Sequence, residues 1–254
     1  MAWKQRATRL PAPYLKRIWL DPAKVERWND YPFSLPMFAG RAFDLAFERP
    51  VTIIVGDNGV GKSTLLEGIA ALAGFDEAGG GPGYRAVDHS QAIERNGGEL
   101  AKALRAQWLP KVTRGWFFRA ESFFSVARYL DEAARGLGPP PDYLSHSHGE
   151  GFLRFFGERT RAQGLFIFDE PESALSPRRQ IEFLRLLRRM ERESGCQAIV
   201  ATHAPILMAY PGAALMRLDP RGLAPIAVDE TEHFQLLREF LADPHAFLSA
   251  HFED

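Results

Sequence analysis

One stretch, residues 51–64, constrains the fold of this chain more than any other. It reads Val-Thr-Ile-Ile-Val-Gly-Asp-Asn-Gly-Val-Gly-Lys-Ser-Thr, an apolar and largely β-branched run followed by a glycine-rich loop and the start of a helical pattern that ends at Gly74. The run predicts a strand buried on both faces, and the loop has the spacing GxxxxGK[ST]. The stretch therefore predicts a phosphate-binding loop between a strand and a helix.

The residue types in this loop suit phosphate binding. Gly56, Gly59 and Gly61 let the backbone curl so that successive N–H groups point at phosphate oxygens, and the helix N-terminus adds partial positive charge. Lys62 is expected to reach the β- and γ-phosphates, and Ser63 to offer its hydroxyl to Mg²⁺. We expect the other residues of the loop to line the nucleotide as well: Asp57, Asn58, Val60 and Thr64.

A second apolar run, residues 164–168, leads directly into Asp169 and Glu170. At the carboxyl end of a parallel strand, these acids would face the phosphate loop. Asp169 is expected to hold Mg²⁺ through water, and Glu170 to polarise the attacking water. An acidic turn in solvent is the ordinary alternative for such a pair, but a phosphate loop in the same chain favours the catalytic interpretation.

A third apolar run, residues 197–201, places Thr202 and His203 at the same predicted edge. A histidine there can hydrogen-bond a γ-phosphate or the attacking water. The alternative is a structural histidine, and the position at a strand end favours the functional role.

The rest of the pattern predicts an α/β fold with a mainly parallel sheet and flanking helices, in a single domain over residues 1–254. Residues 75–160 are expected to form an inserted, mostly helical lobe that begins at a glycine-rich linker. Further strands are predicted over residues 14–20, 43–47, 115–118, 214–218 and 223–228, and helices over 90–109, 122–135, 177–193 and 231–252. The last helix is expected to pack against the sheet and to be interrupted at Pro244.

Tyr31 or Phe33 is a candidate to stack on adenine, although core packing is the commoner role of such aromatic residues.

The composition limits which binding partners and which cellular compartment are expected. Lys and Arg number 31 against 32 Asp and Glu, so the net charge of -1 gives no overall attraction to nucleic acid or anionic membranes, and only a local basic patch stays possible. No apolar run approaches the roughly 18 residues of a spanning helix, and the N-terminus lacks a signal-peptide core, so a cytoplasmic protein is expected. The single cysteine, Cys196, excludes an internal disulfide and is expected to be buried and unreactive.

The order of these motifs resembles the ABC-type ATPases. Residues 144–152, Leu-Ser-His-Ser-His-Gly-Glu-Gly-Phe, precede an apolar helix and resemble the ABC signature segment, with Ser147 and Gly149 in the serine and second glycine positions and Glu150 in place of glutamine. The motifs then follow one another in the order found in ABC-type ATPases: the phosphate loop, the lobe, the signature segment, the Asp-Glu pair, a short loop and a switch histidine. More narrowly, it resembles small stand-alone predicted bacterial ATPases that are often labelled AAA family.

This resemblance implies a mechanism and a partner. In the ABC class, two such domains pack head to tail, and the signature of each completes the ATP site of the other. We therefore expect a nucleotide-dependent homodimer that hydrolyses ATP with Mg²⁺, in which Ser147 and Gly149 contact the γ-phosphate in trans. The sequence departs from the pattern in three places: His148 replaces the first signature glycine, Ser176 replaces the usual loop aspartate, and Glu121 is the candidate for a lobe-coupling glutamine.

Several roles for such an ATPase stay open at this point. The chain could be the ATP-binding subunit of a membrane transporter, or a DNA-associated ATPase, although no heptad run for a coiled coil is present. A ring-forming AAA+ motor and a non-enzymatic, nucleotide-gated binding module are further alternatives. His146 and His148 lack the third partner that a zinc site would need.

Overall fold

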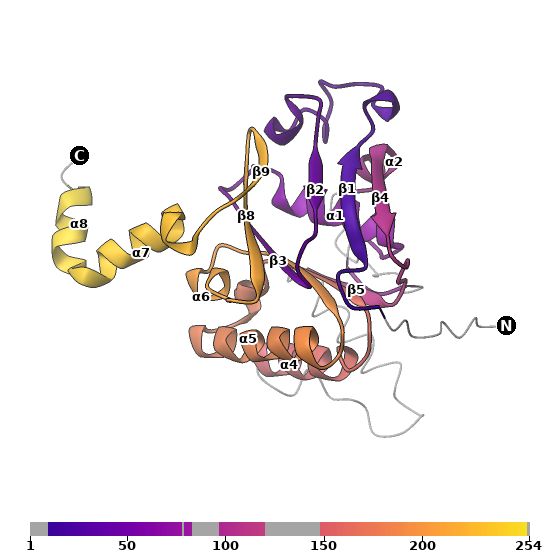
Figure 1. Cartoon of the computed structure of the whole chain (residues 1–254). Helices are drawn as coiled ribbons and strands as arrows, with labels where there is room; N and C mark the ends of the chain where they lie inside the picture. The colour runs from indigo at the N-terminus through magenta and orange to yellow at the C-terminus, as the bar shows by residue number, and fades with distance from the viewer. Residues whose placement is uncertain (1–9, 78, 83–96, 120–147, 253–254) are drawn as a thin grey trace.

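The structure is a computed structural model, and it describes residues 10–77, 79–82, 97–119 and 148–252 (Figure 1). Its strands are β1 Leu15–Leu20, β2 Asp44–Ala46, β3 Val51–Val55, β4 Leu104–Trp108, β5 Gly115–Arg119, β6 Leu165–Asp169, β7 Gln197–Ala201, β8 Ala213–Asp219 and β9 Gly222–Pro225. Its α-helices are α1 Lys62–Ala73, α2 Gly97–Ala103, α4 His148–Arg159, α5 Pro177–Arg192, α6 Pro205–Met208, α7 Glu232–Ala242 and α8 Pro244–Phe252. Short 3-10 helices cover Pro22–Lys24, Pro36–Phe38, Pro171–Ala174 and Val228–Glu230.

A six-stranded sheet in the order β5-β6-β7-β3-β8-β9 forms the centre of the fold. Its first five strands are parallel, and β9 pairs antiparallel with β8, so that the strands predicted over 214–218 and 223–228 form a hairpin. Strands β3, β6 and β7 are buried along their whole length, as their apolar runs predicted. The sheet confirms the predicted α/β class, and it brings the carboxyl ends of these three strands to one edge.

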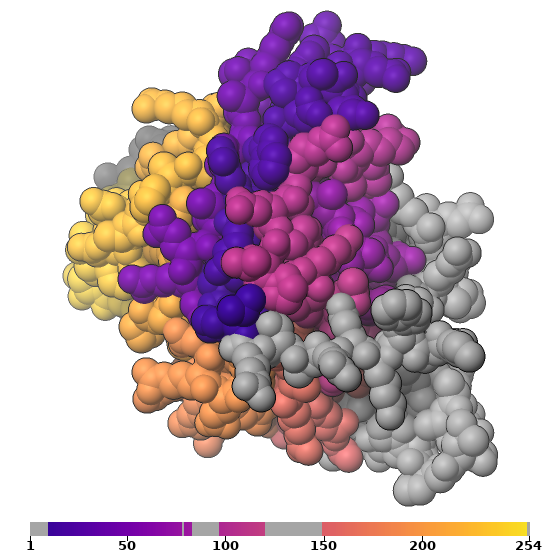
Figure 2. Space-filling model, turned by 45° about the vertical axis from the view of Figure 1, so that its right-hand side comes forward, coloured from indigo at the N-terminus to yellow at the C-terminus, as the bar shows by residue number. Residues whose placement is uncertain are grey.

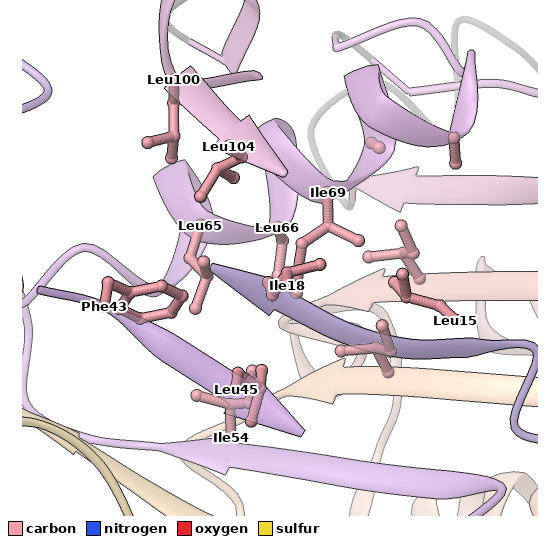
Figure 3. Packing of buried hydrophobic residues seen from close by; sticks show 14 of the residues in the cluster. Leu15, Ile18, Phe43, Leu45, Ile54, Leu65, Leu66, Ile69, Leu100 and Leu104 are labelled. Atoms are coloured by element: carbon pink, nitrogen blue, oxygen red, sulfur yellow. The ribbon is translucent and has the colours of Figure 1, made fainter. Parts of the chain in front are cut away.

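The two faces of the sheet carry separate cores because successive residues of a strand point to opposite sides. Ile54 packs in the cluster that contains Leu65, Leu66 and Ile69 of α1, whereas Ile53 packs in the cluster on the α4 and α5 side. Figure 3 shows these α1 side chains together with residues of β1, β2 and β3. Figure 1 shows α4, α5 and α6 on the other side of the sheet.

Phenylalanines attach α4 and α5 to the sheet. The ring centroids of Phe118 and Phe152 lie 4.6 Å apart, those of Phe156 and Phe168 lie 5.0 Å apart, and Phe168 lies 5.0 Å from Phe183. All three pairs are edge-to-face, an arrangement that adds about 0.5–1.5 kcal/mol per pair to the burial itself. This packing holds the first turn of α4 against the segment that follows β6.

A smaller antiparallel sheet, β2-β1-β4, lies on the α1 side of the molecule. Figure 2 shows the indigo N-terminal residues beside the magenta residues of α2 and β4 on one face. One buried glutamine, Gln197, joins this sheet to the central one. Its Oε1 accepts hydrogen bonds from the N–H groups of Tyr14 (2.8 Å) and Leu15 (2.9 Å), and its Nε2 donates to the Leu15 carbonyl (3.0 Å).

The helix predicted over residues 90–109 is wrong in its second half. Helix α2 ends at Ala103, and Leu104–Trp108 forms β4 instead. Leu104, Ala106 and Trp108 contribute to the core while the residues between them are exposed, a period of two that suits pairing with β1. Within the range 75–160, β4 and β5 thus belong to the two sheets. The helix predicted over 122–135 lies outside the described residues, and an inserted lobe stays a prediction.

The expectation that the C-terminal helix packs against the sheet is also wrong. The chain does break at Pro244, but α7 and α8 bury no residue and extend away from the body (Figure 1). Leu241 and Phe252 are 65% and 77% exposed, and the two helices contact each other through Phe240 and Phe247. The physical reason is that α1 and α5 already cover the two faces of the sheet when the chain leaves β9 at its edge. Among the described residues, every helix is too short or too polar to span a bilayer.

We expect Gln197→Leu to lower the free energy of unfolding by about 3 kcal/mol, because it leaves the buried N–H groups of Tyr14 and Leu15 without an acceptor. Urea unfolding measures the change. The same substitution at Gln107, which is exposed on β4, is the control and should change stability by about 0.5 kcal/mol or less. Equal effects at the two positions would contradict a joining role for Gln197.

Candidate functional site

The predicted phosphate-binding loop lies between β3 and α1 and has the curled backbone that the glycines allow. Gly61 is the N-cap of α1 and has a left-handed φ of 102°. This conformation favours glycine, and a Cβ at Gly61 would in addition push aside the side-chain ends of Leu35 and Met37, which lie 2.9 Å from its position. Asp57, Asn58 and Gly59 are exposed, whereas Val60 is half-buried. The exposed side of the loop is thus free to meet a ligand.

Lys62 lies inside this loop. Its Nζ donates hydrogen bonds to the carbonyl oxygens of Gly56 (2.7 Å) and Asp57 (2.9 Å), and the residue is 5% exposed. Burial lowers the pKa of Lys62, and the nearby carboxylates of Glu170 and Asp169 oppose that shift. The ammonium group is therefore held against the carbonyl oxygens of the loop, and its role in phosphate binding stays a prediction.

The two residues predicted to hold Mg²⁺ meet in the structure. Ser63 Oγ lies 3.2 Å from Asp169 Oδ1, although β7 separates β3 from β6 in the sheet. A hydroxyl and a carboxylate are hard oxygen donors that suit Mg²⁺, which usually keeps several waters and binds substrate phosphates. No group of three or more His, Cys, Asp or Glu that could hold a metal occurs among the described residues. The pair fits an ion that nucleotide oxygens and water help to coordinate.

Arg119, at the end of β5, lies behind this pair and was missed in the sequence analysis. Its Nη1 donates to Glu67 Oε1 on α1 (2.8 Å), and its Nε lies 4.0 Å from Asp169 Oδ2. The three side chains are 13%, 6% and 8% exposed, respectively. The one feature of the sequence that could have indicated its role was a charged residue at the end of an apolar strand. The arginine compensates two buried carboxylates and helps to fix the orientation of Asp169.

Glu170 follows β6 in a conformation that is unusual for a non-glycine residue. Its φ is 47°, its N–H donates to the Ala201 carbonyl (3.0 Å), and its side chain is 45% exposed. Such left-handed residues cost about 1–3 kcal/mol and cluster at functional sites. The backbone thus directs an accessible carboxylate to the edge at which the phosphate loop lies.

His203, after β7, lies beside Glu170 and is held by two residues that were not predicted. Its Nε2 is 3.4 Å from Glu170 Oε1, its backbone N–H donates to Glu172 Oε1 (2.6 Å), and its Nδ1 lies 2.9 Å from His233 Nε2. Burial and the Lys62 charge lower the pKa of His203. Burial raises the pKa of Glu172, and the hydrogen bond from His203 opposes that shift.

Two of the predicted signature residues, Gly149 and Glu150, lie near the segment that follows Glu170. A Cβ at Gly149 would lie 3.2 Å from the Ala174 carbonyl, and Glu150 forms an ion pair with Arg179 of α5. Both contacts are with the segment that follows the Asp-Glu pair. Ser147, Glu121 and the side chains of His146 and His148 lie outside the described residues.

Two further predictions concern the aromatic candidates for adenine binding and the single cysteine. The hydroxyl of Tyr31, a candidate for stacking on adenine, is hydrogen-bonded to Thr64, which is 5% exposed. Phe33, the other candidate, packs against Trp28 with its ring centroid 6.3 Å away. Cys196 is fully buried, as expected, and this burial raises its pKa to about 12, which favours the predicted unreactive thiol.

Comparison with known proteins places these motifs in a class. A family model described as "AAA domain, putative AbiEii toxin, Type IV TA system" matches residues 145–209, and one described as "AAA domain" matches residues 34–107. The sn-glycerol-3-phosphate import ATP-binding protein UgpC of Ruegeria pomeroyi is 28% identical over 180 residues, which are 66% of this chain and 50% of that protein. UgpC of Brucella abortus is 24% identical over 208 residues, which are 74% of this chain and 55% of that protein. These matches support an ABC-type P-loop ATPase.

The chain spans about half the length of the curated relatives it matches. Among solved structures, it is similar to the SMC head domain from Thermotoga maritima, with 17% identity, a TM-score of 0.46, and coverage of 85% of this chain and 100% of that one. It is also similar to cbiO1 from Clostridium perfringens, part of the ABC transporter complex cbiONQ, with 17% identity, a TM-score of 0.39, and coverage of 83% and 91%.

We expect Arg119→Met to lower the free energy of unfolding by about 3–5 kcal/mol, because it removes the cation that pairs with the buried carboxylates of Glu67 and Asp169. Adding Glu67→Gln should restore part of the loss. Arg105→Met, which breaks a more exposed pair with Asp21, is the control and should cost about 1 kcal/mol or less. Urea unfolding tests the series, and a loss at Arg119 as small as at Arg105 would contradict a buried network.

The burial of Glu172 predicts that the free energy of unfolding depends on pH. Because burial raises the pKa of this carboxyl in the folded chain, the wild type should lose stability relative to Glu172→Gln as the pH rises above about 4, and the difference should level off above the raised pKa. The glutamine keeps an acceptor for the His203 N–H but cannot ionise. Unfolding midpoints of the two proteins between pH 4 and pH 8 measure this effect, with Glu48→Gln, at an exposed position, as the control. A difference that does not vary with pH would rule out the effect of burial.

Proposed function

We propose that this ABC-type P-loop ATPase binds ATP with Mg²⁺ and hydrolyses it to ADP and phosphate. The observation that carries the proposal is the 3.2 Å contact between Ser63 Oγ and Asp169 Oδ1, with Lys62 in the loop beside it and Glu170 next along the chain. A structural role alone would not require a lysine, a hydroxyl and two carboxylates to meet at one strand edge.

In the proposed reaction, the loop N–H groups, the N-terminus of α1 and Lys62 orient the β- and γ-phosphates. Ser63 and Asp169 would hold Mg²⁺, which when bound would neutralise charge on the phosphate oxygens. Glu170 accepts a proton from water as the water oxygen bonds to the γ-phosphorus and the bond to the β-phosphate oxygen breaks. His203 Nε2, which is buried and has no hydrogen-bond partner among the described residues, is placed to donate to the γ-phosphate.

We further propose that the active form is a head-to-tail homodimer that assembles on ATP. The side chain of Glu170 is 45% exposed, and Gly149 contacts the segment beyond Glu170 in its own chain. A second copy would close the open side of the site with its own signature residues, Ser147, Gly149 and Glu150. This geometry agrees with the arrangement that the ABC resemblance implies.

A second candidate is the ATP-binding subunit of a membrane transporter. The curated relatives are named import ATP-binding proteins, and this observation favours the candidate. The ATP chemistry would be the same, but the dimer would carry a membrane partner. Co-purification of the chain with a permease would support this role.

The decisive experiment uses Glu170→Gln. Loss of the base should reduce ATP turnover by about 10²–10⁴-fold while leaving ATP binding intact. Light scattering on the variant with and without MgATP should show a shift from monomer to dimer, and Glu48→Gln is the matched control with wild-type turnover. Unchanged turnover in Glu170→Gln would mean that another residue is the base. A hexamer would indicate a ring motor, and a persistent monomer would indicate that another protein completes the site.

A further inference from the structure

Two histidines from distant parts of the chain share a hydrogen bond at the site. Nδ1 of His203 lies 2.9 Å from Nε2 of His233, and the ring centroids are 5.0 Å apart. His233 is in the first turn of α7, which begins after the buried Thr231, whose Oγ1 donates to the Val228 carbonyl (2.7 Å). The start of α7 is thus fixed, although the rest of the helix is exposed.

A hydrogen bond between two ring nitrogens requires that one of them carries the proton. Burial and the neighbouring Lys62 lower the pKa of His203, which favours the neutral ring with a single N–H. The carboxylates of Glu170 and Asp57 oppose this shift, and His233 adds to it. Two arrangements of the shared proton are then possible.

The contact with Glu170 distinguishes the two arrangements. If His203 Nδ1–H donates to His233, the lone pair of His203 Nε2 lies near the Glu170 carboxylate oxygen, 3.4 Å away, and the two repel each other. If His233 Nε2–H donates to His203 Nδ1, the proton of His203 is on Nε2, where the nearby Glu170 carboxylate attracts it without accepting a hydrogen bond from it. Only the second arrangement places a donor on the side where a γ-phosphate would lie.

We propose that His233 is a positioning residue that donates from Nε2 to Nδ1 of His203 and thereby holds His203 as the Nε2–H tautomer. The role in catalysis rests on the proposed ATPase function, whereas the tautomer itself does not. Through this hydrogen bond, His233 in the first turn of α7 keeps the proton of His203 on Nε2, where it can donate to the reacting phosphate. The residue is proposed to act through His203.

Nuclear magnetic resonance tests the tautomer without any activity. In full-length protein with ¹⁵N-labelled histidine, the signals of His203 are assigned by their loss in His203→Asn. We expect a protonated Nε2 and an unprotonated, hydrogen-bonded Nδ1 on His203 in the wild type, and a mixture of tautomers in His233→Leu. Protonation at Nδ1 in the wild type would overturn the inference.

Kinetics of three variants test the effect on turnover. Glutamine can offer an N–H donor near the place of Nε2, glutamate can only accept when ionised, and leucine can do neither. We therefore expect His233→Gln to keep kcat near the wild-type value, and His233→Glu and His233→Leu to reduce it by about 10- to 100-fold with little change in KM for ATP. His245→Leu, at an exposed position on α8, is the control.

The outcomes separate the two proposals. A kcat for His233→Gln as low as that of His233→Leu, in folded protein, would overturn the donor role. If the wild type hydrolyses no ATP, the proposed function fails, and the resonance experiment still decides the tautomer.

Discussion

Parallel pairing of β3, β7 and β6 is the constraint on which the site depends. The register aligns Ile54 with Ala201 and Ala201 with Asp169, so the three strands end at nearly the same level. The phosphate loop and Glu170 directly follow β3 and β6, and His203 follows β7 after Thr202, so they meet because their strands stop together. Since β7 lies between β3 and β6, the contact from Ser63 to Asp169 also requires α1 to begin above the same edge.

Buried polar contacts hold this edge as much as the apolar cores do. Gln197 satisfies the N–H groups that lead into β1 and joins the two sheets, and Arg119 compensates Glu67 and Asp169 beneath the loop. Polar groups taken out of water are costly unless they are paired, so each contact resists displacement of the elements it joins. The phenylalanines on the other face hold α4 and α5 in place. The candidate site is therefore supported from both sides of the sheet.

Much of this arrangement could be predicted because its signals are local. The apolar runs of β3, β6 and β7, the glycine spacing of the loop and the helix ends at Gly74 and Pro177 depend on residues close together in the chain. The wrong predictions concern segments whose structure depends on contacts with residues far away in the sequence. Leu104–Trp108 became a strand because β1 pairs with it, and α7 and α8 stay exposed because other helices already cover the sheet.

The sequence by itself determined the phosphate loop, the acidic pair at the end of β6, the strand that presents His203 and the α/β class, since each depends on local backbone preference and on whether a short run is apolar. Only the tertiary structure decided that Arg119 lies behind Asp169, that Glu172 holds the backbone of His203 and that His233 meets its ring. His203 and His233 are separated by the β8–β9 hairpin, and Arg119 lies far from Glu67 in the chain. Contacts of this kind leave no periodic signal in a single sequence, because they arise only after strands and helices have taken their places in the fold.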